Sequence, residues 1–232
     1  MRIRFVTKNI SIMKKAMILM ATMMMAVTAN AQKLYDMGKY FQPSDEPVEL
    51  NEAVTVKDGL VFVGDTRPAD KIQEGKYRGM RVQKSRRYFT VDGKPTEMQA
   101  ALSFRRAPQG ATKDHLVDPT LVPRSCMLQL KPLSDGQLSF YGLTNKPEGN
   151  NIYVGVMNGK SFKPLATVKF SKFNDNTGRS KKTPAAAQMV DYTYTEGDQL
   201  WIYCDGSVNL QALGFSGQID ETFQGTNPKE VK

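Results

Sequence analysis

The chain has little of what most catalytic and metal sites are made of. It contains a single histidine, His115, and two cysteines, Cys126 and Cys204. One histidine excludes zinc sites built from several histidines and leaves little room for a serine–histidine–aspartate triad. The sequences G-x-S-x-G, H-E-x-x-H, G-x-G-x-x-G and the P-loop are also missing. We therefore expect no enzymatic activity, no metal site and no cofactor, and we interpret His115 as a loop residue.

Long hydrophobic runs are missing as well, with one informative exception near the start. Residues 16–27 form an apolar run of about 12 residues, whereas a membrane-spanning helix needs roughly 20. The run follows Lys14 and Lys15 and ends at Ala29-Asn30-Ala31, a small-x-small cleavage pattern. This combination predicts a signal peptide over residues 1–31, with Gln32 as the first mature residue. We expect a protein exported through the inner membrane to the periplasm or the cell surface, with no transmembrane anchor in the mature chain.

The positive net charge of the chain comes largely from its first 31 residues. The whole chain has 32 lysines and arginines against 23 acidic residues, a formal net charge of +9. Five of the basic residues and none of the acidic ones lie in residues 1–31, so the mature chain keeps 27 against 23, or +4. A mildly basic exported domain is not a nucleic-acid binder by default. We expect no nucleic-acid partner.

Helical periodicity is scarce after residue 31, and alternation of apolar and polar residues is common. Only residues 68–74 could form a short helix, whereas Ile152, Val154 and Val156 show the period of two that is typical of half-buried strands. Asn158-Gly159 and Asp205-Gly206 lie between such runs and predict hairpin turns. The pattern predicts an all-β, antiparallel β-sandwich, jelly-roll-like in topology. One domain over 32–220 is expected, followed by a flexible tail over 221–232.

The two cysteines are expected to point into the core from different strands. Cys126 shares its parity with Leu128 and Leu130, and Cys204 shares its parity with neighbouring apolar residues. Export permits a disulfide, and closing so long a loop would contribute several kcal/mol in the chain-entropy model. Two reduced cysteines would serve equally well as small hydrophobic side chains. A Cys126–Cys204 disulfide and two buried thiols both stay open.

A basic cluster spans residues 71–87 and supplies the first ligand-binding candidates. It is opposed only by Glu74 and consists of Lys71, Lys76, Arg78, Arg81, Lys84, Arg86 and Arg87. We single out Arg78, Arg81, Lys84 and Arg86. In an exported protein such a cluster suits an acidic polysaccharide, an acidic host glycan or an anionic lipid surface. The alternative is an ordinary solvated strand face, with Lys84 and Arg86 pointing away from Arg81.

Aromatic residues supply the second set of candidates. Trp201, the only tryptophan, shares one strand face with Tyr203, while the other face of the same strand is aliphatic. A strand that is apolar on both faces is either central in a covered sheet or presents its rings to a ligand, as carbohydrate-binding modules do. Tyr35, Tyr40 and Phe41 are expected to anchor a first strand to the sandwich.

The C-terminal part of the chain resembles a known class of exported bacterial domains. Residues 196–213 (EGDQLWIYCDGSVNLQAL) resemble the closing hairpin of β-sandwich accessory domains that accompany pectate-lyase-like and other polysaccharide-active modules. Residues 124–130 and 137–143, with a turn at Ser134-Asp135-Gly136, resemble a strand pair of the same domains. The resemblance covers about residues 86–215 and implies a non-catalytic, carbohydrate-associated sandwich. It carries over no binding residues.

Three functions follow in order of preference. The first is an exported, non-enzymatic β-sandwich protein that binds a glycan or another cell-surface ligand. The second is a structural or adhesin-like interaction subunit of the envelope. The third is a polysaccharide lyase or hydrolase, because carboxylates are plentiful and sequence alone does not place a catalytic pair.

Overall fold

The computed structural model describes residues 32–50, 54–64, 80–104, 117–170 and 177–231. The chain divides into two units, residues 1–31 and 32–232, and the second holds all of the described structure. The predicted signal peptide, the short helix over 68–74, His115 and Arg78 lie outside the described residues.

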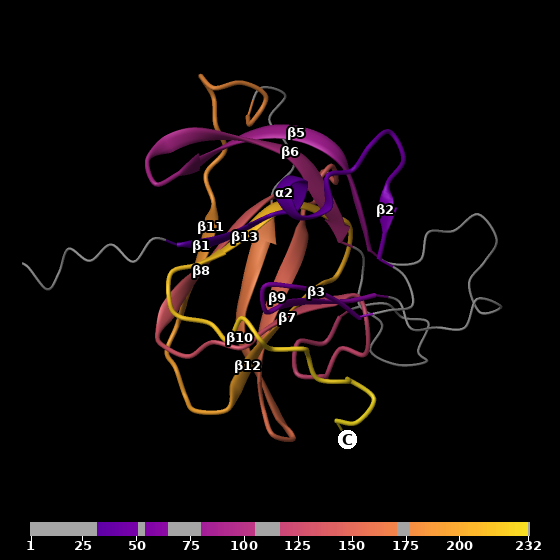
Figure 1. Ribbon diagram of the computed structural model, residues 1–232, viewed down its shortest axis with the longest axis vertical. Helices are drawn as coiled ribbons and strands as arrows, with labels where there is room; N and C mark the ends of the chain where they lie inside the picture. The colour runs from indigo at the N-terminus through magenta and orange to yellow at the C-terminus, as the bar shows by residue number, and fades with distance from the viewer. Residues whose placement is uncertain (1–31, 51–53, 65–79, 105–116, 171–176, 232) are drawn as a thin grey trace, which may run out of the picture. The chain divides into compact units, whose positions relative to one another are not determined.

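The larger sheet is antiparallel, and its strands come from the N-terminal, middle and C-terminal parts of the chain (Figure 1). Its strand order is β11 (Gln188–Tyr192), β8 (Gly136–Leu143), β13 (Val208–Phe215), β6 (Lys94–Phe104), β5 (Arg81–Val91) and β2 (Val48–Glu49). A seventh strand, β1 (Lys33–Asp36), pairs with β13.

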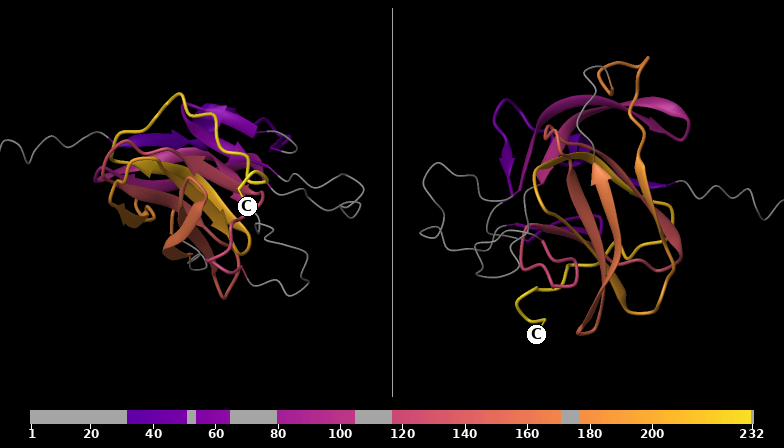
Figure 2. Two further views of the ribbon diagram at one scale, coloured as in Figure 1. Left: turned by 90° about the horizontal axis from the view of Figure 1, so that it is seen from below. Right: turned by 180° about the vertical axis from the view of Figure 1, so that it is seen from behind.

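The smaller sheet is also antiparallel and packs against the larger one (Figure 2). Its order is β10 (Ser161–Phe170), β9 (Asn150–Asn158), β12 (Asp198–Cys204), β7 (Met127–Leu130), β4 (Leu60–Val63) and β3 (Val54–Lys57). One hydrophobic cluster joins the two sheets: Phe140 and Leu213 of the larger sheet share it with Leu128 and Ile202 of the smaller one. The prediction of an all-β antiparallel sandwich is therefore confirmed, and from β6 onward the chain crosses between the sheets repeatedly, as in jelly rolls.

Of the two predicted hairpin turns, one is confirmed and the other is wrong. Asn158-Gly159 joins β9 to β10 as a hairpin, as expected. Asp205-Gly206 does not form a hairpin, because β12 lies in the smaller sheet and β13 in the larger one. Asp205 instead fixes a corner: its Oδ1 accepts from the Asn151 backbone N–H at 2.8 Å, and its Oδ2 accepts from the Asn151 amide at 2.6 Å. The expected strand pair 124–130 with 137–143 is wrong for the same reason, since β7 and β8 belong to different sheets.

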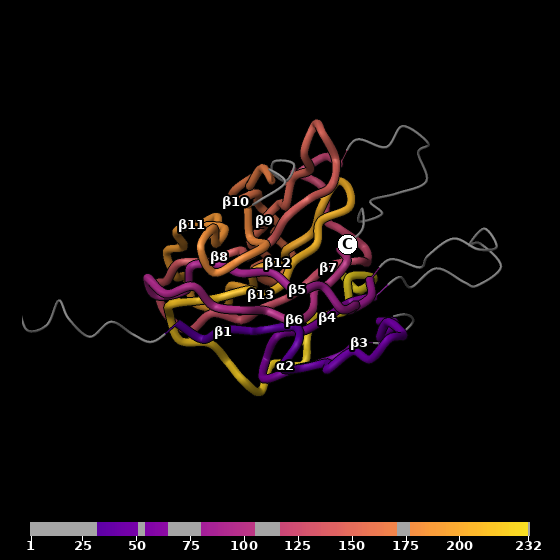
Figure 3. Tube along the Cα trace, turned by 90° about the horizontal axis from the view of Figure 1, so that it is seen from above, coloured from indigo at the N-terminus to yellow at the C-terminus, as the bar shows by residue number. Residues whose placement is uncertain are grey.

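The first described residues of the chain form a strand and a short helix. The hairpin of β5 and β6 diverges from β13 after Leu210, and β1 pairs with the rest of β13, from Ala212 to Phe215 (Figure 3). Helix α2 (Met37–Phe41) follows at once, and the Asp36 carboxylate caps it by accepting from the Gly38 N–H at 2.9 Å. As expected, the aromatic residues of this segment anchor it, because Tyr35 and Tyr40 donate to Asp58 in the β3–β4 turn at 2.9 and 2.7 Å.

The two cysteines are buried thiols in this structure rather than a disulfide. Both belong to the cluster between the sheets, as their parity predicts. The Cys204 thiol donates to the Gly206 carbonyl at 2.8 Å. Of the two alternatives left open by the sequence, this structure contains the pair of small buried side chains.

The C-terminal segment, residues 220–231, overlaps the tail predicted over 221–232 and makes specific contacts with the smaller sheet. Gln129, which is fully buried, donates its amide to the Thr226 carbonyl at 2.9 Å and accepts from the Thr226 N–H at 2.8 Å. Phe223 packs against hydrophobic residues of the smaller sheet, and Asp220 accepts from Lys131 at 2.9 Å. The Gln129 amide, the apolar contact of Phe223 and the Lys131–Asp220 ion pair therefore hold this segment in place. The composition of the segment itself does not predict these contacts.

Candidate functional site

The aromatic candidates lie on the face of the smaller sheet that is turned away from the sandwich core. Trp201 and Tyr203 are both 0% exposed. Residues from β4, β7 and β9 surround them, and the C-terminal segment covers them through Phe223 and Val231. The Trp201 indole N–H donates to Gln199 at 3.2 Å, and the Tyr203 hydroxyl donates to the Pro119 carbonyl at 3.2 Å. Neither ring is open to a ligand in this structure, so the strand is a central strand of a covered sheet.

The basic candidates lie on β5, where a β-bulge changes the direction of the side chains. Lys84 pairs with Ala100 and Arg87 with Met98, so Ser85 and Arg86 together face the single residue Gln99. A bulge of this kind breaks strict alternation. Lys84 and Arg86 consequently line one pocket, although Arg81 lies apart from it, with its guanidinium 4.0 Å from Glu49.

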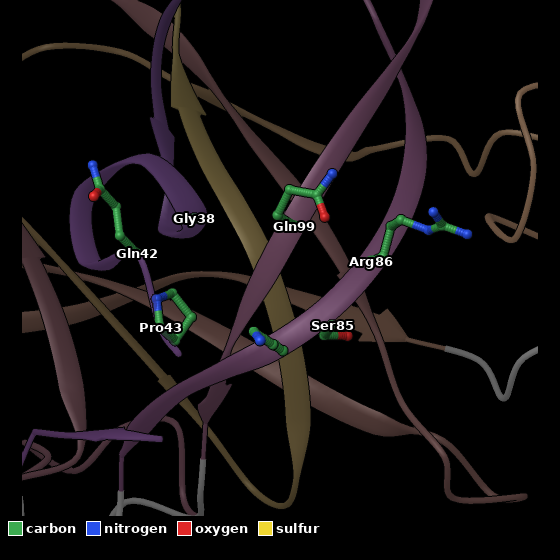
Figure 4. Close-up of a pocket in the computed structure, with 7 residues that line it drawn as sticks. Gly38, Gln42, Pro43, Ser85, Arg86 and Gln99 are labelled. Atoms are coloured by element: carbon green, nitrogen blue, oxygen red, sulfur yellow. The ribbon is translucent and has the colours of Figure 1, made fainter. Parts of the chain in front are cut away.

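That pocket has a volume of about 300 Å³ and joins β5 and β6 to the end of α2. Its lining consists of Gly38, Gln42, Pro43, Lys84, Ser85, Arg86 and Gln99. Figure 4 shows Gln42 and Pro43 on one side and Arg86 on the other, with Gln99 between them. The Lys84 ammonium donates to Asp45 at 2.8 Å, and since the Asp45 side chain is 98% exposed, this ion pair is weak and open to exchange.

A loop remote in sequence brings further positive charge to β5. The Tyr88 N–H donates to the Gly178 carbonyl at 2.8 Å, and the Ala185 N–H donates back to Tyr88 at 2.9 Å. The Thr90 N–H then donates to the Ala185 carbonyl at 2.9 Å. These backbone bonds fix the loop over 177–187 along the edge of β5, and its exposed members include Arg179, Lys181 and Lys182.

The pKa shifts of Arg87 and Glu97 indicate that charges of β5 and of the loop over 177–187 lie close together. Burial, followed by the charge of Arg179, lowers the pKa of Arg87. The pKa of Glu97 is also lowered, chiefly by the hydrogen bond from the Tyr88 hydroxyl, with smaller contributions from Arg86 and Lys181. A single carboxylate therefore senses one cation from β5 and one from the loop.

We use the name basic surface for the exposed or half-exposed cations of the loop and of β5 from Lys84 onward, which leaves out Arg81 beside Glu49. Its members are Lys84, Arg86, Arg87, Arg179, Lys181 and Lys182. Only the first three belong to the cluster seen in the sequence. The loop residues were missed: the run Arg179 to Lys182 is visible in the sequence, but nothing local places it beside β5.

A second pocket, of about 460 Å³, lies on the smaller sheet. It is lined by Val156, Asn158, Ser161, Lys163, Pro164, Leu165, Thr195 and Asp198. Its buried carboxylate, Asp198, accepts from the Asn158 amide at 2.8 Å and from the Tyr192 hydroxyl at 2.9 Å. Both carboxylate oxygens are thus engaged within the protein, and Lys163 is the one cation that lines this pocket.

The described residues offer neither a metal-binding cluster nor a membrane-spanning helix. They contain no group of three or more histidine, cysteine or acidic side chains arranged to hold a metal ion. Within the same residues, no helix combines the length and the hydrophobicity that crossing a membrane requires.

Comparison with known proteins gives little beyond this geometry. No protein-family model matches the chain, and no curated protein matches it significantly in sequence. Among solved structures, the K2 cleaved adhesin domain of Lys-gingipain is similar over 80% of this chain and 97% of its own length, with 14% identity and a TM-score of 0.35. At this identity and TM-score we draw no conclusion from the similarity, and the resemblance to polysaccharide-associated domains stays a prediction.

Proposed function

We propose that the protein is an exported, non-enzymatic β-sandwich protein that binds an acidic polysaccharide at the basic surface. The observation that carries the proposal is the junction of two segments: backbone hydrogen bonds fix the loop over 177–187 along β5, and Glu97 senses one cation from each, Arg86 and Lys181. Lys84 and Arg86 line a polar pocket beside this junction. Charges gathered from distant parts of a chain on one exposed surface raise the local concentration of a polyanion.

The pocket chemistry favours a sugar polymer among the polyanions. Gln42, Ser85 and Gln99 offer amide and hydroxyl groups that can exchange hydrogen bonds with sugar hydroxyls. Arg86 offers a planar fork of donors that matches a carboxylate or a sulfate. No carboxylate lines this pocket, whereas hydrolysis of a glycosidic bond needs two. Binding rather than cleavage is therefore the activity that we propose.

The test compares a polyanion with its neutral counterpart on the exported, processed protein. Biolayer interferometry measures binding of polygalacturonate and of neutral galactan of equal length. We expect saturable binding of polygalacturonate, weakened by added salt because exposed charges are screened. The triple variant Arg179→Gln/Lys181→Gln/Lys182→Gln should weaken this binding about tenfold, or ~1.4 kcal/mol, since exposed ion pairs contribute less than about 1 kcal/mol each.

A matched control removes the same charge elsewhere. Lys160, Lys163 and Lys169 are exposed on β10 or the turn before it, and Lys163 lines the second pocket. The variant Lys160→Gln/Lys163→Gln/Lys169→Gln should bind polygalacturonate as the wild type does. Equal losses in both variants would mean that net charge alone attracts the polymer. Preference for anionic vesicles or for single-stranded DNA over polygalacturonate would also overturn the proposal.

A further inference from the structure

Gln32, the residue that the signal-peptide prediction places at the mature N-terminus, has an unusual side-chain environment. It precedes β1, whose Leu34 pairs with Gly214 of β13. The Gln32 amide lies directly over that glycine: a Cβ added to Gly214 would lie 1.3 Å from Gln32 Nε2. Gly214 therefore leaves the space that the amide fills.

The two ends of this amide differ in their bonding. Gln32 Oε1 accepts a hydrogen bond from the Tyr141 hydroxyl at 3.3 Å. Gln32 Nε2 is buried and has no hydrogen-bond partner among the residues that the structure describes. A buried amide nitrogen without a partner costs free energy, so this side chain would gain from losing its nitrogen while keeping its oxygen.

We propose that Gln32 is a modification site, at which cleavage after Ala31 is followed by cyclisation to pyroglutamate. The freed α-amino nitrogen attacks Cδ of the same residue, and a bond forms between them. The Cδ–Nε2 bond breaks, and the nitrogen leaves as ammonia with the proton given up by the amine. No oxidant, reductant or co-reactant is consumed.

Cyclisation removes the buried nitrogen that has no hydrogen-bond partner among the described residues. The five-membered lactam retains a Cδ carbonyl, the kind of acceptor that the Tyr141 hydroxyl now uses, and removes the nitrogen that lacks a partner. It also removes the positive charge of the α-amino group, whose pKa is ordinarily about 8. Residue 32 directly precedes β1, and β1 pairs with the central strand β13. The modified N-terminus would therefore lie beside the larger sheet. The inference rests on the predicted cleavage and not on glycan binding.

The experiment is mass spectrometry of the protein expressed from its full gene and purified after export. We expect an N-terminal peptide that begins at residue 32, is lighter than the encoded peptide by one ammonia and resists Edman degradation. The variant Gln32→Asn should be cleaved at the same place and keep its full mass, because an asparagine cannot close the same five-membered ring. A wild-type N-terminus at Gln32 with an intact amine, or one at another residue, would overturn the inference.

Discussion

The two surfaces that the sequence nominated for binding differ in what covers them. Trp201 and Tyr203 lie on a sheet face, fully buried beneath the C-terminal segment and residues near Val117 and Val122. Lys84 and Arg86 lie on β5 and are exposed. The loop beside β5 adds further positive charge but does not cover them. In both cases a segment distant in sequence decides the role of the surface.

The difference follows from the chemistry of the two surfaces. An exposed patch of large aromatic rings is costly in water, so a covering segment that packs on it gains free energy. Exposed cations are well solvated, and covering them without partners would be costly. The apolar surface is therefore incorporated into the fold, and the charged surface stays available to a partner.

The largest expected effect concerns the covered surface. Trp201→Ala should destabilise the protein by about 3–5 kcal/mol, because it opens a cavity beneath the C-terminal segment. Urea unfolding followed by circular dichroism measures the change. Met189→Ala, at a β11 side chain that is 60% exposed, is the matched control and should cost less than about 0.5 kcal/mol. Similar losses in the two variants would contradict the burial of Trp201.

The next effect concerns the segment that covers Trp201. Gly225 has φ +91°, and a Cβ there would lie 2.8 Å from Val61 Cγ1. Gly225→Ala should therefore cost about 1–3 kcal/mol, from backbone strain and from displacement of the segment. Gly93→Ala, at φ +74° with no atom within 4 Å of the new Cβ, isolates the backbone contribution. Equal melting temperatures for the two variants would show that the C-terminal segment does not lie close to β4.

A smaller effect is expected from acid, at the start of the same segment. Hydrogen bonds from Thr222 and then from Lys131 lower the pKa of Asp220 to about 2, from 3.8. The lowered pKa means that the ionised carboxylate contributes stability above the unfolded pKa, and that this contribution is lost as pH falls from about 4 through about 2. Thermal melts should show a steeper loss over that window for the wild type than for Asp220→Asn. Parallel curves would contradict the role of the Asp220 carboxylate.

Local signals in the sequence were enough to predict the fold class and one of the two hairpin turns. Alternation of apolar and polar residues predicted the strands, and Asn158-Gly159 predicted a hairpin. Both features depend only on residues that are adjacent in the sequence. The turn at Asp205-Gly206 was misread because a turn sequence does not say whether the next strand stays in the same sheet. The corner depends on Asn151, a residue brought close only by the finished sandwich.

The candidate site could be predicted only in part for the same reason. Lys84 and Arg86 appeared to point in opposite directions under strict alternation, and the bulge opposite Gln99 is invisible without the partner strand. Arg179 and Lys181 lie near β5 only because their loop forms backbone hydrogen bonds with Tyr88. Coverage of Trp201 likewise depends on Gln129 holding the C-terminal segment.

The central claim is that β5 and the loop over 177–187 act as one polyanion-binding surface, and lysine footprinting tests it most directly. Acetylation rates at individual lysines are measured by mass spectrometry with and without polygalacturonate. The account predicts that Lys84, Lys181 and Lys182 become protected together, while Lys160 and Lys163 on the smaller sheet react as before. Protection centred on Lys160 and Lys163, or protection of Lys84 without the loop lysines, would contradict it.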